Sequence, residues 1–192
     1  TIYSTQDTAL QEKMDEVMVK NSSQYAKKSS KTGATTQSAM VVIDNATGYV
    51  VGVEGGLGEK KESRGLNRAT QSTRQTGSSI KPLTSLVPGI SEGVITASTI
   101  FDDNPTSFNN GTYEPKNFGY SYRGLITVRE AIAYSQNVPM VKTMCLLTPE
   151  KSIEFLKSVG ITSIDEEKDC VLPLALGGLT WGITPLQMAG AY

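Results

Sequence analysis

The sequence predicts an α+β fold in which one β-hairpin near the N-terminus is followed by mostly helical chain. Three observations support this prediction. Two apolar runs, 39–44 and 49–53, flank a turn with the sequence Asn-Ala-Thr-Gly, which is the pattern of a hairpin. From Lys81 onward, apolar residues and cap residues are spaced as they are in helices. The 192 residues, 38% of them hydrophobic, suffice to bury the core of a single domain.

The elements before the hairpin are a helix and a loop. The helix is expected over residues 5–20, where apolar side chains recur at helical spacing after two polar cap candidates. The apolar residues are Leu10, Met14, Val17 and Met18, and the cap candidates are Thr5 and Asp7. These apolar side chains are expected in the core. Residues 21–38 are polar and are expected to form a loop.

Loop and helix-cap residues predict the elements that follow in the second half of the chain. The segment 102–124 is rich in Asn, Pro and Gly and is expected to be a loop. A capping box at 127–130, a cap followed by proline at 148–149, and both devices at 184–187 predict three helix starts. The last of these helices has barely begun at Tyr192, so we expect the chain to be one piece of a larger protein.

Composition excludes several classes of function. The chain has no histidine, which excludes Ser-His-Asp triads and histidine-based metal sites. The net charge is −1, and the dense basic group Lys27, Lys28 and Lys31 lies in the polar loop, so no nucleic acid partner is expected. Cys145 and Cys170 are too few for a zinc site; each is expected to be a small buried hydrophobe, with a disulfide as the alternative.

Targeting signals are absent from these residues. No apolar run has the length of a membrane span, and no signal peptide precedes the first helix. Because the chain starts at Thr1 without a methionine, any targeting segment is expected outside it.

Ser78 and Lys81 are the leading candidates for chemistry. They lie in the segment Gly77-Ser78-Ser79-Ile80-Lys81-Pro82, and a helix places residues i and i+3 on one face. Proline is tolerated in the first turn of a helix, so the serine is expected near a helix N-terminus, where free N–H groups stabilise developing negative charge. Taken alone, the pattern is equally that of an ordinary helix start.

A second candidate cluster is Ser135-Gln136-Asn137. It falls where the helix from 127 should end and before Pro139, which starts the next helix. A serine and an amide would face a cleft at such a break. Taken alone, the triplet is more typical of a polar helix terminus.

Taken together, the blocks resemble the transpeptidase domain of class A, bifunctional penicillin-binding proteins. The approach to the nucleophile spans 65–70 and 74–82, with Thr76 where the family usually has proline. Further blocks follow in family order, at 113–117, 127–131, 135–139, 174–178 and 182–189, and the opening Thr5-Gln6-Asp7 is similar to the family's domain start. Residues 1–192 are therefore expected to be the N-terminal part of such a domain. The resemblance implies the serine β-lactamase/transpeptidase fold, an antiparallel sheet flanked by helices, incomplete in this chain.

The family's third motif, a Lys-Thr-Gly strand, is expected after Tyr192. Lys31-Thr32-Gly33 has the same letters but precedes Ser78 and lies in the polar loop, so we reject it. The remainder of the domain, which could be a second chain, is an expected partner. Without it the fragment is expected to be inactive.

The resemblance implies a DD-transpeptidase that cross-links peptidoglycan stem peptides and is acylated by β-lactam antibiotics. Ser78 would be the nucleophile, Lys81 its base, Ser135 a proton relay, and Asn137 a hydrogen-bond partner of both Lys81 and the substrate. Substrate-binding positions would be Gln136, Gly177 and Gly178, the two glycines chiefly as a close-packed turn.

Two alternatives to a transpeptidase stay open: a silent wall-binding or β-lactam-sensing domain, and a serine β-lactamase or DD-carboxypeptidase. No metal or organic cofactor is expected. The resemblance places the domain on the outer side of the bacterial cell membrane, anchored by a segment not in this chain.

Overall fold

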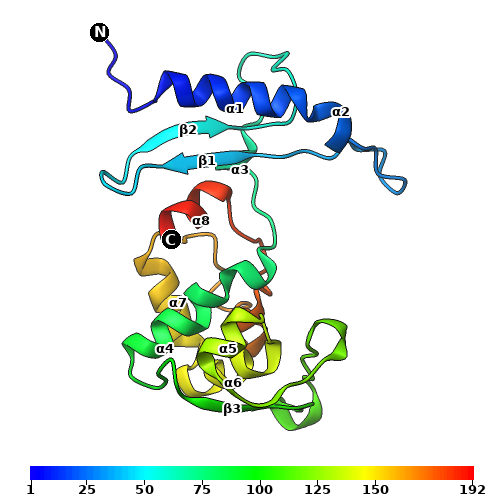
Figure 1. Cartoon of the computed structure of the whole chain (residues 1–192), viewed down its shortest axis with the longest axis vertical. Coiled ribbons are helices and arrows are strands. Elements are labelled where there is room, and N and C mark those ends of the chain that lie inside the picture. The colour runs from blue at the N-terminus through cyan, green and yellow to red at the C-terminus, as the bar shows by residue number, and fades with distance from the viewer. The chain divides into compact units, whose positions relative to one another are not determined.

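The computed structural model describes all residues 1–192 and divides them into two compact units (Figure 1). The N-terminal unit contains Thr1–Arg74 and Ile183–Tyr192, and the central unit contains Gln75–Gly182. Each unit has its own elements and is described separately. The assignment of residues 1–192 to one transpeptidase domain stays a prediction.

The N-terminal unit is a hairpin covered by helices. Strands β1 (Met40–Ile43) and β2 (Val50–Glu54) pair antiparallel, with Val41 opposite Val53. Helix α1 packs against β2, while α8 packs against β1 and α3. The helices of this unit are α1 (Thr8–Lys20), α2 (Ser22–Tyr25), α3 (Arg68–Gln71) and α8 (Pro185–Ala191). The predicted hairpin and first helix are thereby confirmed, and the predicted loop 21–38 contains the single turn α2.

Burial along α1 follows the predicted pattern only in part. Asp7 caps the helix, and its carboxylate accepts a hydrogen bond from the backbone N–H of Leu10. Met14 and Met18 are buried, whereas Leu10 is half-buried. Val17 is exposed, so its expected place in the core was wrong. The apolar stripe is therefore narrower than the spacing indicated.

The central unit is built around a buried helix. Helix α6 contacts α4, α5, α7 and β3, and its residues Val138, Met140, Val141 and Met144 are fully buried. The helices are α4 (Val87–Ser91), α5 (Val128–Ala133), α6 (Asn137–Leu147) and α7 (Pro149–Ser158). Shorter 3₁₀ turns lie at Gly77–Ile80, Asn109–Gly111, Phe118–Tyr120 and Leu172–Leu176, and a π-helical stretch lies at Pro82–Leu86.

A second antiparallel strand pair corrects the two ends of the segment 102–124, which was predicted to be loop. Strands β3 (Ile100–Asp103) and β4 (Gly124–Thr127) pair antiparallel, with Asp103 opposite Gly124. The sequence Ile-Phe-Asp-Asp of β3 has no apolar alternation, and such a strand forms only because a distant segment pairs with it. Between the strands, the chain is irregular as expected.

All three predicted helix starts are confirmed, and two of them have the expected capping hydrogen bonds. Thr127 forms a capping box with Glu130 at α5, and Thr184 forms one with Gln187 at α8. Thr148 precedes α7 and its proline, but it has a positive φ of 77° and makes no capping hydrogen bond to the helix. Its backbone is turned by the preceding helix end, which removes the extended geometry that a cap needs.

The cysteines were predicted wrongly as buried hydrophobes. Cys145 is exposed and Cys170 is partly exposed, and both are free thiols. The Cys170 thiol donates to a carboxylate oxygen of Glu150 at 3.3 Å, so it lies at a polar surface. Cys145 lies on an exposed face of α6, although most of that helix is buried. Composition alone does not show which face of a helix is exposed. None of the helices combines the length and apolar character that crossing a bilayer requires.

Candidate active site

Ser78 and Lys81 lie on one turn of the central unit. Gly77–Ile80 is a 3₁₀ turn in which the Lys81 N–H donates to the Ser78 carbonyl, and the π-helical stretch from Pro82 follows it. In a 3₁₀ helix, residues i and i+3 are eclipsed, so the serine and lysine lie on the same side. Ser78 is exposed, whereas Lys81 is fully buried. The predicted helix start is present, but as 3₁₀ and π geometry, which is frequent at functional sites.

The Lys81 ammonium is surrounded by acceptors from the second predicted cluster. Its Nζ donates to Asn137 Oδ1 at 2.6 Å and to the Ser135 carbonyl at 2.7 Å. Ser135 Oγ lies at 3.1 Å, and the Gln136 carbonyl lies at 3.4 Å. None of these partners is a carboxylate. The fold therefore brings together both sequence-predicted clusters, which are more than fifty residues apart.

Burial lowers the pKa of Lys81 to about 8. An ammonium removed from water loses hydration, and neutral acceptors compensate less than a carboxylate would. At pH 7 about a tenth of such lysines are neutral, against fewer than ~1 in 1,000 for an unperturbed lysine. The site thus holds an amine that can take a proton near neutral pH.

Ser135 is held in a strained conformation. It has a positive φ of 53° and links α5, which ends at Ala133, to α6, which begins at Asn137. A non-glycine residue in this region costs about 1–3 kcal/mol and persists only where the surroundings fix it. The turn directs both the carbonyl and the hydroxyl of Ser135 to Lys81. The strained conformation thus supplies two hydrogen-bond acceptors to the ammonium.

Asn137 has a fixed amide orientation. Its Oδ1 accepts from Lys81, and its Nδ2 donates to the Lys116 carbonyl at 2.6 Å. A side-chain amide has two N–H donors, so Lys116 uses one of them. Gln136, which was predicted to bind substrate, is nearly fully buried. Its contact with the site is its backbone carbonyl.

Two residues beside the site had no role in the sequence analysis. Asn117 and Asp103 are buried, and Asn117 Nδ2 donates a hydrogen bond to Asp103 at 2.8 Å. The side-chain oxygen Oδ1 of Asn117 accepts from the backbone N–H of Asn137 at 2.7 Å. Asn117 belongs to a block that carried the family resemblance. Asp103 left no signal in the sequence, because its burial depends on the pairing of β3 and β4.

Gly177 packs directly against the turn of Ser78. It has a positive φ of 84° and follows the 3₁₀ turn Leu172–Leu176. A Cβ atom at this position would lie 2.7 Å from the Gly77 carbonyl oxygen. At Gly178, a Cβ atom would lie 3.1 Å from the Pro173 carbonyl oxygen. Both glycines permit close packing, and their predicted substrate contact stays a prediction.

We expect Gly177→Ala to destabilise the fold by about 2–4 kcal/mol, because it adds a backbone clash to a strained φ. Gly160→Ala is the matched control: its φ is 86°, and a Cβ atom there meets nothing within 4 Å. That control should cost only about 1 kcal/mol. Urea unfolding of both variants measures the difference. Equal losses would show that the clash with Gly77 relaxes without cost.

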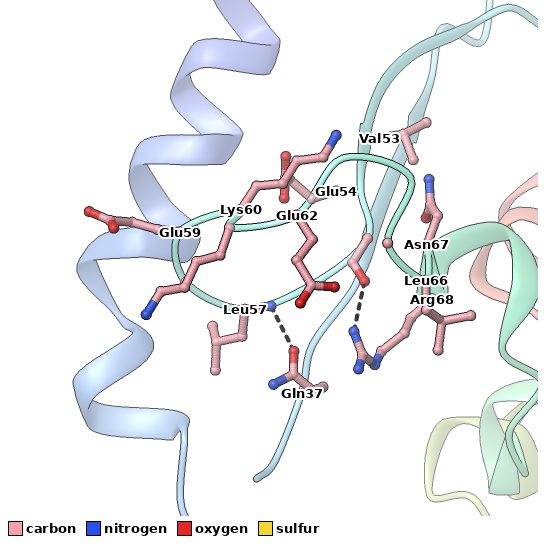
Figure 2. A pocket seen from close by; sticks show the side chains of 15 residues that line it. Gln37, Val53, Glu54, Leu57, Glu59, Lys60, Glu62, Leu66, Asn67 and Arg68 are labelled. Atoms are coloured by element: carbon pink, nitrogen blue, oxygen red, sulfur yellow. Dashed lines mark hydrogen bonds between the residues drawn. The ribbon is translucent and has the colours of Figure 1, made fainter.

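The N-terminal unit contains a cavity of about 590 Å³ (Figure 2). Its lining carries both signs of charge, and the labelled side chains include Glu54, Lys60 and Arg68. Arg68 donates to the Gly55 carbonyl at 3.5 Å, and Asn67 caps α3.

Glu54, at the edge of this cavity, is joined to Asp15 through Gln11. The Gln11 amide donates to Glu54 Oε1 at 2.9 Å and to Asp15 Oδ1 at 2.8 Å. Burial, followed by the hydrogen bond and charge of Asp15, raises the pKa of Glu54 to about 7. A raised folded-state pKa contributes stability that is complete below pH 4.5 and is lost as the pH rises through 7.

We therefore expect Glu54→Gln to stabilise the chain at pH 8 and to flatten the pH dependence of stability between 4.5 and 7. The gain should be on the order of 1 kcal/mol or less, because Glu54 is partly exposed and water screens its charge. Thermal unfolding across this pH range measures the effect, with Glu59→Gln as an exposed control. An unchanged pH profile would refute the carboxyl coupling.

The Lys-Thr-Gly letters at 31–33 do not form a strand. They lie in an exposed turn of the N-terminal unit, in which the Gly33 N–H donates to the Ser29 carbonyl. The prediction that this tripeptide lies in a polar loop is confirmed. No group of three or more His, Cys, Asp or Glu side chains is placed to hold a metal ion.

Comparison with known proteins identifies the family. The sequence model of the penicillin binding protein transpeptidase domain matches residues 38–192. The chain belongs to the penicillin-binding protein transpeptidase family. It is 38% identical to penicillin-binding protein 1F of Bacillus subtilis over 183 residues, which cover 93% of this chain and 24% of the relative. The chain thus spans about a quarter of the length of that relative.

Solved structures of penicillin-binding proteins share the fold. Penicillin-binding protein 1A of Haemophilus influenzae superposes with a TM-score of 0.70 at 29% identity, covering 86% of this chain and 25% of that one. PonA1 of Mycobacterium tuberculosis, solved in complex with penicillin V, gives 0.75 at 22% identity over 100% of this chain and 50% of that one. The predicted transpeptidase-like fold class and the resemblance to class A members are confirmed.

Proposed function

We propose that this chain carries the nucleophile of a peptidoglycan DD-transpeptidase. The observation that supports it most is the buried Lys81, which lies three residues after an exposed serine and contacts only neutral acceptors. A hydroxyl is a weak nucleophile until a base removes its proton. A lysine with a pKa of about 8 is such a base in a site without histidine.

In the proposed reaction, Ser78 Oγ attacks the carbonyl carbon of the D-Ala-D-Ala peptide bond, and its proton passes to neutral Lys81. The C–N bond then breaks, and the leaving amine of D-alanine takes a proton from Lys81 through Ser135 Oγ, which lies 3.1 Å from Nζ. The product is an ester between Ser78 and the stem peptide. An amine of a neighbouring stem attacks this ester, forms the new peptide bond and returns the proton to Ser78 through Lys81.

The remaining parts of the site are also proposals. Asn137 would orient the substrate amide, and the turn of Ser78 would supply an N–H donor to the developing oxyanion. We propose that a Lys-Thr-Gly strand from outside residues 1–192 completes the site, and that the protein works outside the cell membrane, tethered by another segment. A β-lactam would acylate Ser78 because its strained amide mimics the peptide end, and release would be slow.

Intact-mass analysis after exposure to a penicillin tests the proposal. It should be run on residues 1–192 and on the full-length protein. A stable adduct of one drug molecule on the full-length protein supports a transpeptidase. Rapid release of hydrolysed drug would instead indicate a β-lactamase, and binding without an adduct would indicate a silent sensor. An adduct on residues 1–192 alone would show that the proposed additional strand is not needed for acylation.

A further inference from the structure

Asp103 and Asn117 form a buried polar pair under the start of α6. Asp103 is fully buried, and Asn117 is nearly so. The Asn117 Nδ2 donates to Asp103 Oδ1 at 2.8 Å and to the Ser121 carbonyl at 3.0 Å. The second carboxylate oxygen of Asp103 accepts from the Arg123 backbone N–H at 3.0 Å. Every polar atom of the Asn117 amide and both oxygens of Asp103 are thus used.

The pair supplies a cap that α6 lacks. Gln136 is the N-cap residue of α6, and its side chain makes no capping hydrogen bond. Instead, Asn117 Oδ1 accepts from the N–H groups of Asn137 and Val138, at 2.7 and 3.3 Å. A helix N-terminus leaves its first N–H groups without partners inside the helix, and Asn117 fills that need from another segment.

The same segment also fixes the Asn137 side chain. The Lys116 carbonyl accepts from Asn137 Nδ2, so Lys116 and Asn117 hold one residue by its side chain and by its backbone. Asn137 Oδ1 is then turned to Lys81. Any change at Asn117 acts on Lys81 through Asn137.

We propose that Asp103 and Asn117 are positioning residues of the Lys81 site. They fix Asn137, and they place the Asn117 amide between the buried carboxylate of Asp103 and the N-terminus of α6. The proposal rests on the proposed function in that it assigns Lys81 the role of base. Asn117 offers its oxygen to α6 as a neutral amide. The carboxylate behind it polarises that amide and is itself stabilised by hydrogen bonds from two N–H donors.

Exchanging Asp103 and Asn117 tests the position of the negative charge while largely preserving the hydrogen-bonding geometry. In the double variant Asp103→Asn with Asn117→Asp, the new amide at 103 can donate to the carboxylate at 117 and still accept from Arg123. The carboxylate at 117 can accept from Asn137 as before, but the Ser121 carbonyl loses its donor and faces a carboxylate oxygen. The helix N-terminus tolerates the charge. The hydrogen bonds to Arg123, to Asn137 and between the two residues can be kept, while the negative charge moves toward Lys81.

The experiment compares the full-length protein with the exchanged variant and with Asn117→Asp alone. We expect the exchanged variant to fold, with a melting temperature lowered by no more than about 10 °C through the lost Ser121 contact. Its Ser78 acylation at pH 7 should fall about tenfold, because the pH midpoint of acylation rises by about one unit when a carboxylate favours the charged lysine. Asn117→Asp alone places two carboxylates together and should unfold at a clearly lower temperature.

The exposed pair Asp102 and Asn104 provides a matched control. Asn104, which directly follows β3, donates to Asp102 at 2.6 Å. The exchange Asp102→Asn with Asn104→Asp should leave stability and the acylation profile unchanged. An unshifted acylation midpoint in the Asp103/Asn117 exchange would overturn the proposal and leave a purely structural pair.

Failure of the proposed function has a different signature. If the original full-length protein forms no adduct, the transpeptidase assignment fails, and the Lys81 amine is then titrated by NMR in both proteins. A titration midpoint that rises in the exchanged variant supports the positioning role. Equal midpoints refute it.

Discussion

Ser78→Ala will abolish the covalent penicillin adduct, with a loss in acylation rate of at least ~10⁴-fold. The physical reason is that Ser78 is the proposed nucleophile, and catalysis by a covalent intermediate cannot proceed without its nucleophile. Folding should survive, because Ser78 is exposed and its removal leaves no buried polar group unpaired. Intact mass and thermal unfolding of the full-length protein measure the two effects.

Ser79→Ala is the matched control for this prediction. Ser79 is the next residue and is also exposed, but its hydroxyl donates to the Thr76 carbonyl at 2.8 Å. We expect this variant to keep the adduct. An adduct that persists in Ser78→Ala, or that disappears only in Ser79→Ala, would move the nucleophile away from Ser78.

Lys81→Arg will reduce acylation by at least ~10³-fold, although the positive charge is retained. Arginine keeps its proton at every accessible pH, so it cannot accept the proton of Ser78. The planar guanidinium also fits poorly among acceptors that lie 2.6 to 3.4 Å from a compact ammonium. The rate of acylation by a penicillin measures the effect, and near-normal acylation would contradict the role of Lys81 as base.

The original protein should show a matching pH dependence. Because burial lowers the pKa of Lys81 to about 8, acylation should rise tenfold per pH unit below 8 and level off above it. The pH dependence of folding stability also depends on the ionisation of Lys81. A lysine pKa lowered from 10.5 costs the folded state stability below pH 8, and this cost disappears as the pH rises from 8 to 10.5. Lys81→Arg should remove both features.

The helix caps and the first hairpin could be predicted from the residues themselves. Asp7, Thr127 and Thr184 begin their helices through hydrogen bonds to residues within one turn, so short-range chemistry is sufficient to predict them. The same holds for the hairpin of β1 and β2. The residues at 78, 81, 135 and 137 could also be proposed from the sequence, because their types and their order resemble a family.

The contacts of these residues depend on packing between segments that are distant in the chain. The pairing of β3 with β4 buries Asp103, the 3₁₀ and π geometry carries Lys81 into the unit, and the turn at Ser135 directs two oxygens to it. The exposure of Cys145 and Val17 was decided in the same way. Burial depends on which distant segments meet, and the lowered pKa of Lys81 follows from burial. No spacing along the chain contains that information, because desolvation is a property of the packed site.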